Sequence, residues 1–427
     1  MNEEFLYYLW KFRLLYPELI TVQGESLVIL HPGERNTDSG PDFLNARLRI
    51  GKTVWAGNVE IHIHASDWFK HRHQDDPAYN NIILHVVYEN DLCIKHENKF
   101  NFPTLVVKNQ FPHRISDNYQ SLMLNKQWIP CYNQIINLKD PVFLLWSPGL
   151  TIDRLRSKSE VIDQIWESCQ KDWEETFYRY LSMNFGFKIN SLPFELLAKS
   201  LPLRIIRQHV HHYFQLEALL YGQAGMLERK SPGDYPTKLA SEYSFLRQKY
   251  GLNPIPVQYW KFLRLRPSNF PTLRISQWAE ILHRNKGFFF PLMAADSLMA
   301  MKTMLNVNSS KYWNDHYTFD KTSVYQVKLL GDQSVNLLII NGIVPFMFNY
   351  GEKQSQPLIK EKAIRILEQL PAEENSLISK WEKTGINSEN ALQTQALIEL
   401  KHSYCEKKIC LHCRIGNALL AAKEKEI

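Results

Sequence analysis

The sequence lacks the features that send a chain into or across a membrane. Its first residues have neither the basic start nor the apolar run of a secretory signal. Its best apolar stretch, Gly287 to Met293, is short and contains Pro291, so no segment is long enough to span a bilayer. Cysteine is scarce, with six in 427 residues, which excludes a disulfide framework in a chain of this size. We therefore expect a cytoplasmic protein with no membrane partner.

An excess of one charge is also missing. Lys and Arg number 50 against 44 Asp and Glu, and so small a basic excess permits a nucleic-acid partner without arguing for one. Hydrophobic residues make up 44% and charged residues 22% of the chain, which is typical of a folded, soluble protein. The chain is longer than one ordinary core requires, and its pattern divides it into residues 1–112, 113–320 and 321–427.

Residues 1–112 have the pattern of a compact α/β domain, beginning with a predicted helix from Glu3 to Tyr16. A helical or irregular segment, Asp67–Tyr79, interrupts the strands. The predicted strands are Leu27–Leu30, Phe43–Ile50, Thr53–His64, Ile82–Tyr88 and Thr104–Val107. Residues 113–320 are mainly helical in pattern, and residues 321–427 combine helices with a predicted strand at Asn336–Ile340.

Polar residues gather on one face of a predicted hairpin that turns at Gly51-Lys52. Side chains alternate along a strand, so Glu60, His62 and His64 share one face, and the apolar residues between them share the other. If the hairpin pairs as its pattern predicts, Asp42 at the start of the first strand lies near Glu60 and His62. Two carboxylates placed together are suitable ligands for Mg²⁺ or Mn²⁺. A metal held there activates water and stabilises charge on a phosphate.

These residues resemble the signature of the PD-(D/E)XK nuclease superfamily, which is Pro-Asp, a hairpin, and then an acidic residue, any residue and Lys. Pro41-Asp42 and Glu60-Ile61-His62 match it, and the predicted element order agrees with the αβββαβ core of that superfamily. The resemblance implies a restriction-endonuclease-like fold, a nucleic-acid substrate and a divalent metal bound by Asp42 and Glu60. It also implies a supporting acidic residue on the first helix, Glu4 or Glu3.

One position departs from that signature. His62 stands where the superfamily has the Lys that positions or polarises the nucleophilic water. A histidine does similar work near neutral pH or binds a metal, but the change also fits an altered or lost activity. We therefore keep two hypotheses. One is a metal-dependent nuclease with Asp42, Glu60 and His62 as its catalytic residues, and the other is a non-catalytic nucleic-acid-binding protein with a degenerate nuclease fold.

Histidines are concentrated around the hairpin, where six of the fifteen in the chain fall between residues 31 and 85. Singly, each is more often structural than a ligand, but together they favour a functional pocket. The supporting residues are His64, His71, His73 and His85. The run His71-x-His73-x-Asp75 also resembles the zinc-binding run of the metallo-β-lactamase fold, which implies a zinc hydrolase. Asp76 stands where that family has a further His, and the preceding segment has a helical pattern where the family has a strand.

Over most of its length the chain resembles DUF2851, an uncharacterised bacterial family. The resemblance is carried by Gly40–Phe43, Gly57–His62, Ser66–Trp68, Ile83–Val87, Arg266–Arg274 and the cysteines near the C-terminus. This resemblance implies no activity, so the chemistry has to be inferred from the residues themselves.

Three arginines lie in the segment predicted to be helical. Arg264, Arg266 and Arg274 surround an aromatic residue and two prolines. Arginine contacts phosphate in a bidentate manner, so one hypothesis is a loop that binds nucleic acid. The alternative is a rigid turn between helices.

Three cysteines lie close together near the C-terminus. The run Cys405-x4-Cys410-x2-Cys413, preceded by His402, offers four soft ligands for a structural Zn²⁺. Cys131 is an alternative fourth ligand, in which case an iron–sulfur cluster is the expected occupant. Reduced, inert cysteines on a packed helix are the third alternative.

Overall fold

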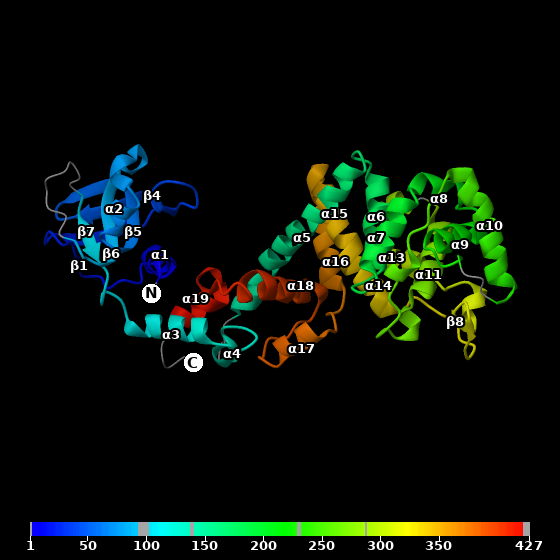
Figure 1. Ribbon diagram of the computed structural model, residues 1–427. Helices are drawn as coiled ribbons and strands as arrows, with labels where there is room; N and C mark the ends of the chain where they lie inside the picture. The colour runs from blue at the N-terminus through cyan, green and yellow to red at the C-terminus, as the bar shows by residue number, and fades with distance from the viewer. Residues whose placement is uncertain (1, 93–101, 137–140, 229–231, 287, 422–427) are drawn as a thin grey trace. The chain divides into compact units, whose positions relative to one another are not determined.

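The computed structural model describes residues 2–92, 102–136, 141–228, 232–286 and 288–421. The chain divides into two compact units (Figure 1). Unit 1 combines Met1–Trp146 with Leu400–Ile427, and unit 2 is Ser147–Glu399. Helix α5 (Val142–Ser168) begins in the first and continues into the second. The three-domain division made from the sequence stays a prediction.

Unit 1 is built on a mixed sheet of seven strands. The strands are β1 (Leu19–Ile20), β2 (Ser26–His31), β3 (Glu34–Arg35), β4 (Phe43–Ile50), β5 (Thr53–His64), β6 (Ile82–Glu89) and β7 (Thr104–Val106). Along the sheet the order is β1, β2, β4, β5, β6, β7, with β3 paired to β4. Neighbours from β1 to β5 are antiparallel, whereas β6 is parallel to β5 and β7 to β6. The parallel pairing requires a crossover from β5 to β6, and this crossover carries part of the site.

Short helices accompany the sheet. They are α1 (Glu3–Lys11), α2 (Asp67–Lys70), α3 (His113–Leu124), α4 (Tyr132–Ile135) and α19 (Arg414–Ala421). Helix α1 begins at Asn2, whose side chain accepts a hydrogen bond from the N–H of Phe5. It ends at Lys11, earlier than the predicted Tyr16, because Arg13 adopts a left-handed φ of 51°.

The predicted hairpin is confirmed, since β4 and β5 have the predicted bounds. Gly51, with φ 56°, makes the turn between them. Below the turn the apolar side chains of Val59 and Ile61 are fully buried, and burial of such side chains stabilises the fold by about 1.5–3 kcal/mol each.

Unit 2 is mainly helical. Beyond α5 its helices are α6 (Trp173–Phe185), α7 (Ser191–Ser200), α8 (Leu203–His209), α9 (Tyr213–Gln223), α10 (Asp234–Tyr250), α11 (Pro271–Asn285), α12 (Phe289–Ala294), α13 (Leu298–Leu305), α14 (Asp332–Leu338), α15 (Val344–Lys353), α16 (Pro357–Gln369), α17 (Ser376–Glu382) and α18 (Ala391–Glu399). A small hairpin, β8 (His316–Thr318) and β9 (Lys321–Thr322), accompanies them. A mixed-sheet region followed by a mainly helical region is therefore confirmed.

Two predictions about the apolar segment of α14 and α15 were wrong. Asn336–Ile340, predicted as a strand, is helical and leads into a π-helical turn, Ile339–Ile343, because a buried helix and a buried strand have the same continuous apolar pattern. The prediction that no segment is long enough to span a bilayer was also wrong, because the run Asp332–Lys353 is long and apolar enough to cross a membrane. However, 72% of its apolar window is buried inside the protein, as in the core helix of a soluble protein.

Candidate metal centre

The two carboxylates singled out from the sequence lie together at the open end of the hairpin. Phe43 pairs with Val59, which places Asp42 beside Glu60. The N–H of Asp42 donates to Glu60 Oε2 at 3.0 Å, and the N–H of Ile61 donates to Asp42 Oδ2 at 2.9 Å. Each carboxylate is thus bound by the backbone of the opposite strand.

Asp42 is also held from its other side. Arg35 Nη1 lies 3.1 Å from Asp42 Oδ1, and the Arg35 guanidinium stacks over the ring of Tyr7 at 3.9 Å. The Tyr7 hydroxyl lies close enough to Asp42 to favour its ionised form. Burial raises the pKa of Asp42, and these hydrogen bonds and the Arg35 charge act against that shift. Sequence reasoning missed both Tyr7 and Arg35, and the one available signal was the spacing of Tyr7 four residues after Glu3 on α1.

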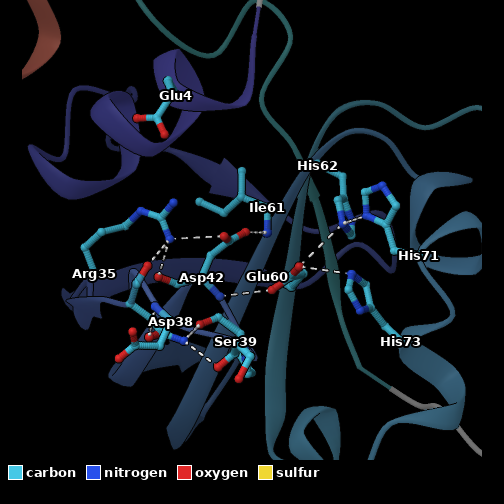
Figure 2. A network of polar contacts seen from close by, with 12 residues as sticks. Glu4, Arg35, Asp38, Ser39, Asp42, Glu60, Ile61, His62, His71 and His73 are labelled. Atoms are coloured by element: carbon cyan, nitrogen blue, oxygen red, sulfur yellow. Dashed lines mark hydrogen bonds and ion pairs between the residues drawn. The ribbon is translucent and has the colours of Figure 1, made fainter. Parts of the chain in front are cut away.

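Three imidazoles meet on the opposite side of Glu60. We call His62, His71 and His73 the histidine trio. One ligand nitrogen from each lies within 4.8 Å of the others, and His62 Nε2 is 3.2 Å from His71 Nδ1. Glu60 Oε1 is 3.4 Å from His62 Nε2 and 3.3 Å from His73 Nε2. Figure 2 shows Glu60 between Asp42 on one side and the trio on the other.

The crossover between β5 and β6 supplies two members of the trio. His71 ends α2, and His73 begins a 3₁₀ turn, His73–Asp75. Arg72 between them has φ 60°, and this left-handed residue lets both histidines reach β5. The ring of His73 then stacks on Tyr79 with centroids 3.9 Å apart.

His85 on β6 contacts the histidine trio through His62. Its Nε2 lies 2.9 Å from Nδ1 of His62, and its side chain is fully buried. This contact leaves the other nitrogen of His62 facing Glu60 and His71. A histidine whose second nitrogen is fixed in this way is preoriented to bind a metal ion.

Burial controls the protonation of these groups. Desolvation, together with the charge of Asp42, raises the pKa of Glu60 to about 9. Desolvation and neighbouring imidazoles lower the pKa of His62 to about 2, of His73 to about 4 and of His85 to about 3. Near neutral pH these imidazoles are uncharged, and the neutral imidazole is the form that binds metal. A bound cation would favour the ionised form of Glu60.

The donor set suits a transition-metal ion. His73 Nε2 is buried and forms no hydrogen bond, although Glu60 Oε1 lies 3.3 Å away, and such a nitrogen is costly to bury unless another group satisfies it. Imidazole nitrogens with a carboxylate oxygen are typical ligands of Zn²⁺ and related metals, whereas Mg²⁺ prefers oxygen alone. Within the described part of the chain, the trio is the one group of three His, Cys, Asp or Glu with ligand atoms this close.

Three residues expected at the site lie elsewhere. His64 is partly exposed and lies 3.9 Å from Glu89. Glu4 lies 3.4 Å from His412, and Figure 2 shows it apart from Glu60 and the histidine trio. Burial raises the pKa of the neighbouring Glu3, and the charge of Asp42 adds to that shift, so Glu3 is near Asp42. Asp75 is exposed, and its carboxylate accepts a hydrogen bond from Gln74.

The three arginines of unit 2 are not equivalent. Arg264 and Arg266 are exposed, whereas Arg274 is buried and donates to Asn269, Gln277 and Ser334. Arg266 and Arg274 line a cavity of about 630 Å³. Desolvation lowers the pKa of Arg274 to about 10. Arg274 therefore fixes the loop that precedes α11 through neutral partners.

The C-terminal cysteines lie in unit 1, near Cys131. Cys410 and Cys413 are buried and Cys405 is half-buried, whereas His402 is exposed. Burial, together with the neighbouring thiols of Cys131, Cys413 and Cys410, raises the pKa of Cys405.

Comparisons with known proteins give one result. The model of the family DUF2851, described as a protein of unknown function, matches residues 3–376. No curated protein and no solved structure matched the chain.

Proposed function

We propose that this chain, which belongs to the DUF2851 family, is a divalent-metal-dependent hydrolase that cleaves phosphodiester bonds in nucleic acid. The observation that carries the proposal is the meeting of the histidine trio with Glu60, at 3.3 and 3.4 Å from two of its members. Mn²⁺ and Zn²⁺ are the ions that best fit this donor set.

The nucleic-acid part of the proposal is supported by the PD-(D/E)XK resemblance. When the two-residue strands β1 and β3 are left out, the order α1, β2, β4, β5, α2, β6 follows the αβββαβ order that this resemblance implies. The Pro-Asp and the acidic residue of the signature also lie side by side. The missing lysine is replaced by His62, which in this proposal binds the metal ion.

The residues around the metal site have separate roles. A bound divalent ion would lower the pKa of a water molecule and stabilise charge on the phosphate. In this proposal Glu60 Oε1, which lies 3.4 Å from His62 Nε2 and 3.3 Å from His73 Nε2, would bind that ion or accept a proton from the water. Asp42 is a positioning residue, because both of its oxygens already have partners. Arg35 is a quarter exposed and offers a guanidinium to a phosphate.

Metal binding and cleavage are tested separately on the full-length protein. Equilibrium dialysis with Zn²⁺, Mn²⁺ and Mg²⁺ is compared for the wild type, His71→Ala and His64→Ala. His71 is exposed, so its loss puts the fold at little risk, and His64 is a matched control on the same strand as His62. We expect His71→Ala to weaken binding of Zn²⁺ and Mn²⁺ and His64→Ala to leave it unchanged. Equal binding by all three proteins would overturn the metal site.

Cleavage is measured on single- and double-stranded DNA and RNA with each metal or with chelator. Asp42→Ala and Glu60→Ala serve as site variants and His64→Ala as the control. We expect metal-dependent cleavage that is lost in Glu60→Ala and reduced in Asp42→Ala. Cleavage that survives both variants would indicate another site. Metal binding without any cleavage would favour the non-catalytic nucleic-acid-binding alternative.

A zinc hydrolase acting on another ester is the second candidate function. It is favoured by the nitrogen-rich ligand set. The zinc-hydrolase alternative expected His71, His73 and Asp75 as ligands, and His62 lies with the two histidines in place of Asp75. Cleavage of a small aryl ester or phosphate diester by the Zn²⁺-loaded protein, without cleavage of nucleic acid, would select it.

A further inference from the structure

Unit 2 contains a cavity of about 630 Å³. Its lining comes from three stretches of the chain, within residues 186–194, 265–274 and 329–337, and all of them belong to unit 2. The volume lies within the range of about 300–1,000 Å³ that is usual for small-molecule sites. The second stretch is the arginine loop, for which the sequence left phosphate binding and a rigid turn as alternatives. This loop therefore borders a space large enough for a ligand.

One wall of the cavity carries a buried guanidinium without a counter-charge. Arg274 is 4% exposed. It donates to the side-chain oxygens of Asn269, Gln277 and Ser334 at 2.6, 3.0 and 3.0 Å, and all three acceptors are neutral. Its Nε is buried without a hydrogen-bond partner, and within the described residues no carboxylate forms an ion pair with it. A buried charge is costly unless an opposite charge compensates it, so an anion in the cavity would stabilise this arrangement.

Two further cations line the same cavity. They are Lys188 and Arg266, whose side chains are exposed. Among the described residues that line the cavity, Asp332 is the one acidic side chain. Three cations and one carboxylate leave an excess of two positive charges, and a phosphomonoester carries a charge of about −1.5 to −2 at neutral pH. The charge of the cavity therefore matches a phosphomonoester better than a single carboxylate.

The walls of the cavity are fixed by contacts within the protein. Phe187 adopts a left-handed φ of 48°, which is uncommon for a residue other than glycine, and its ring lies 4.8 Å from the Arg274 guanidinium. Asn190 is buried, and its side chain binds both the N–H and the carbonyl oxygen of Lys261, at 2.9 and 3.0 Å. A site held in this way binds a ligand with little loss of conformational entropy.

The apolar part of the lining bears on the size of the ligand. Ile189, Leu265, Leu329 and Leu337 contribute to the walls, and a phosphate group alone would leave them without a partner. We propose that the cavity binds a phosphomonoester carried on an organic group, of about the size of a nucleotide. Arg266 and Lys188 contact the phosphate, and Arg274 acts on it through its charge. The inference does not depend on the proposed hydrolase, because it concerns unit 2 alone.

The test is isothermal titration calorimetry on the full-length protein, with chelator present so that no metal-dependent cleavage occurs. The probes are ribonucleoside 5′-monophosphates and the matching nucleosides, and the proteins are the wild type, Arg266→Ala and Arg264→Ala. Arg264 is exposed in the same loop and does not line the cavity, so it is the matched control. We expect the nucleotides to bind the wild type and Arg264→Ala equally, and to bind Arg266→Ala about 10-fold more weakly. Failure of any nucleotide to bind, nucleosides that bind as tightly as nucleotides, or equal losses in the two variants would overturn the proposal.

A strand of nucleic acid ends in the same phosphomonoester, and a competition arm separates the two sources. A short 5′-phosphorylated DNA strand and its 5′-hydroxyl counterpart are each added to the nucleotide complex. Displacement by the phosphorylated strand alone would identify a strand end as a ligand, and displacement by neither would identify the free nucleotide. Equal displacement by both strands would show binding through phosphodiesters and would refute the assignment.

A second measurement locates the ligand without a variant. Amide hydrogen exchange of the wild-type protein is compared with and without nucleotide. We expect slower exchange within residues 186–190, 265–274 and 331–334, with the sheet of unit 1 unaffected. Protection confined to unit 1 would place the nucleotide elsewhere and contradict the proposal.

Discussion

Replacement of His85 by Phe tests how the histidine trio is held. His85 Nε2 lies 2.9 Å from His62 Nδ1 and fixes the ring so that the other nitrogen faces Glu60. Loss of such a partner typically lowers metal affinity about 10- to 100-fold, which corresponds to about 1.4–2.7 kcal/mol. We therefore expect the dissociation constant for Zn²⁺ to rise by that factor in His85→Phe.

The fold should tolerate this substitution. The ring of His85 lies 5.4 Å from that of Trp68 and 6.0 Å from that of Phe102, an environment that accepts a phenyl ring. The variant leaves His62 Nδ1 unpaired, but it also removes His85 Nδ1, which is buried without a hydrogen-bond partner. Each unpaired group costs about 1–3 kcal/mol. We therefore expect the free energy of unfolding to change by no more than about 1 kcal/mol.

The assay is competition for Zn²⁺ between the protein and a chelating dye, with urea unfolding of the metal-free protein alongside. His64→Phe is the control, because His64 lies outside the trio. Wild-type affinity in His85→Phe would show that His85 does not orient the trio. Affinity as low as in His73→Ala would show that His85 is itself a ligand.

Three further predictions concern charge and hydrogen bonding. Burial lowers the pKa of Lys158 from its ordinary value of 10.5 to about 7. Between pH 7 and pH 10.5 the unfolded chain therefore binds more protons than the folded chain. Wild-type stability should therefore rise with pH across that range by up to about 4 kcal/mol, and this rise should be absent in Lys158→Met, which also loses the hydrogen bond to Asn341. Calorimetry at pH 7 and 10 checks this, and a stability difference that does not change with pH contradicts it. Arg274→Met should destabilise unit 2 by about 2 kcal/mol in thermal unfolding, because the buried acceptor of Gln277 and the part-buried acceptors of Asn269 and Ser334 lose their donor. Unchanged stability with weaker nucleic-acid binding would instead make Arg274 a phosphate contact. Tyr7→Phe should destabilise unit 1 by about 1 kcal/mol in urea, because Asp42 loses a polar neighbour while the ring beneath Arg35 is kept. It should leave Zn²⁺ affinity unchanged. Lost Zn²⁺ affinity would show that Asp42 helps to hold the ion.

The hairpin and its carboxylates were predictable because their signals are local. Alternating side chains define β4 and β5, and Gly51 marks the turn. Once the hairpin pairs, the two-residue period of a strand places Asp42 beside Glu60 without reference to the remaining chain. Asn336–Ile340 shows the opposite case, because an apolar run without periodicity does not distinguish a buried helix from a strand.

The histidine trio was not predictable as a group. Its assembly depends on the left-handed conformation of Arg72 and on the parallel placement of β6 beside β5, and neither leaves a mark in a single sequence. Sequence reasoning placed His71 and His73 among the supporting residues of a pocket at the hairpin, and alternatively in a zinc-binding run with Asp75. It assigned His62 to the place of a lysine. Arg35 was missed because the strand pairing of β3 with β4 brings it to Asp42.

The most direct test of the metal centre is a crystal structure of the protein soaked with Zn²⁺, with anomalous data collected at the zinc edge. We expect one strong peak about 2 Å from the ligand nitrogens of the histidine trio, with a Glu60 oxygen beside it. The absence of a peak at the trio, or a peak bound by Asp42 and Glu60 without the histidines, would contradict the account.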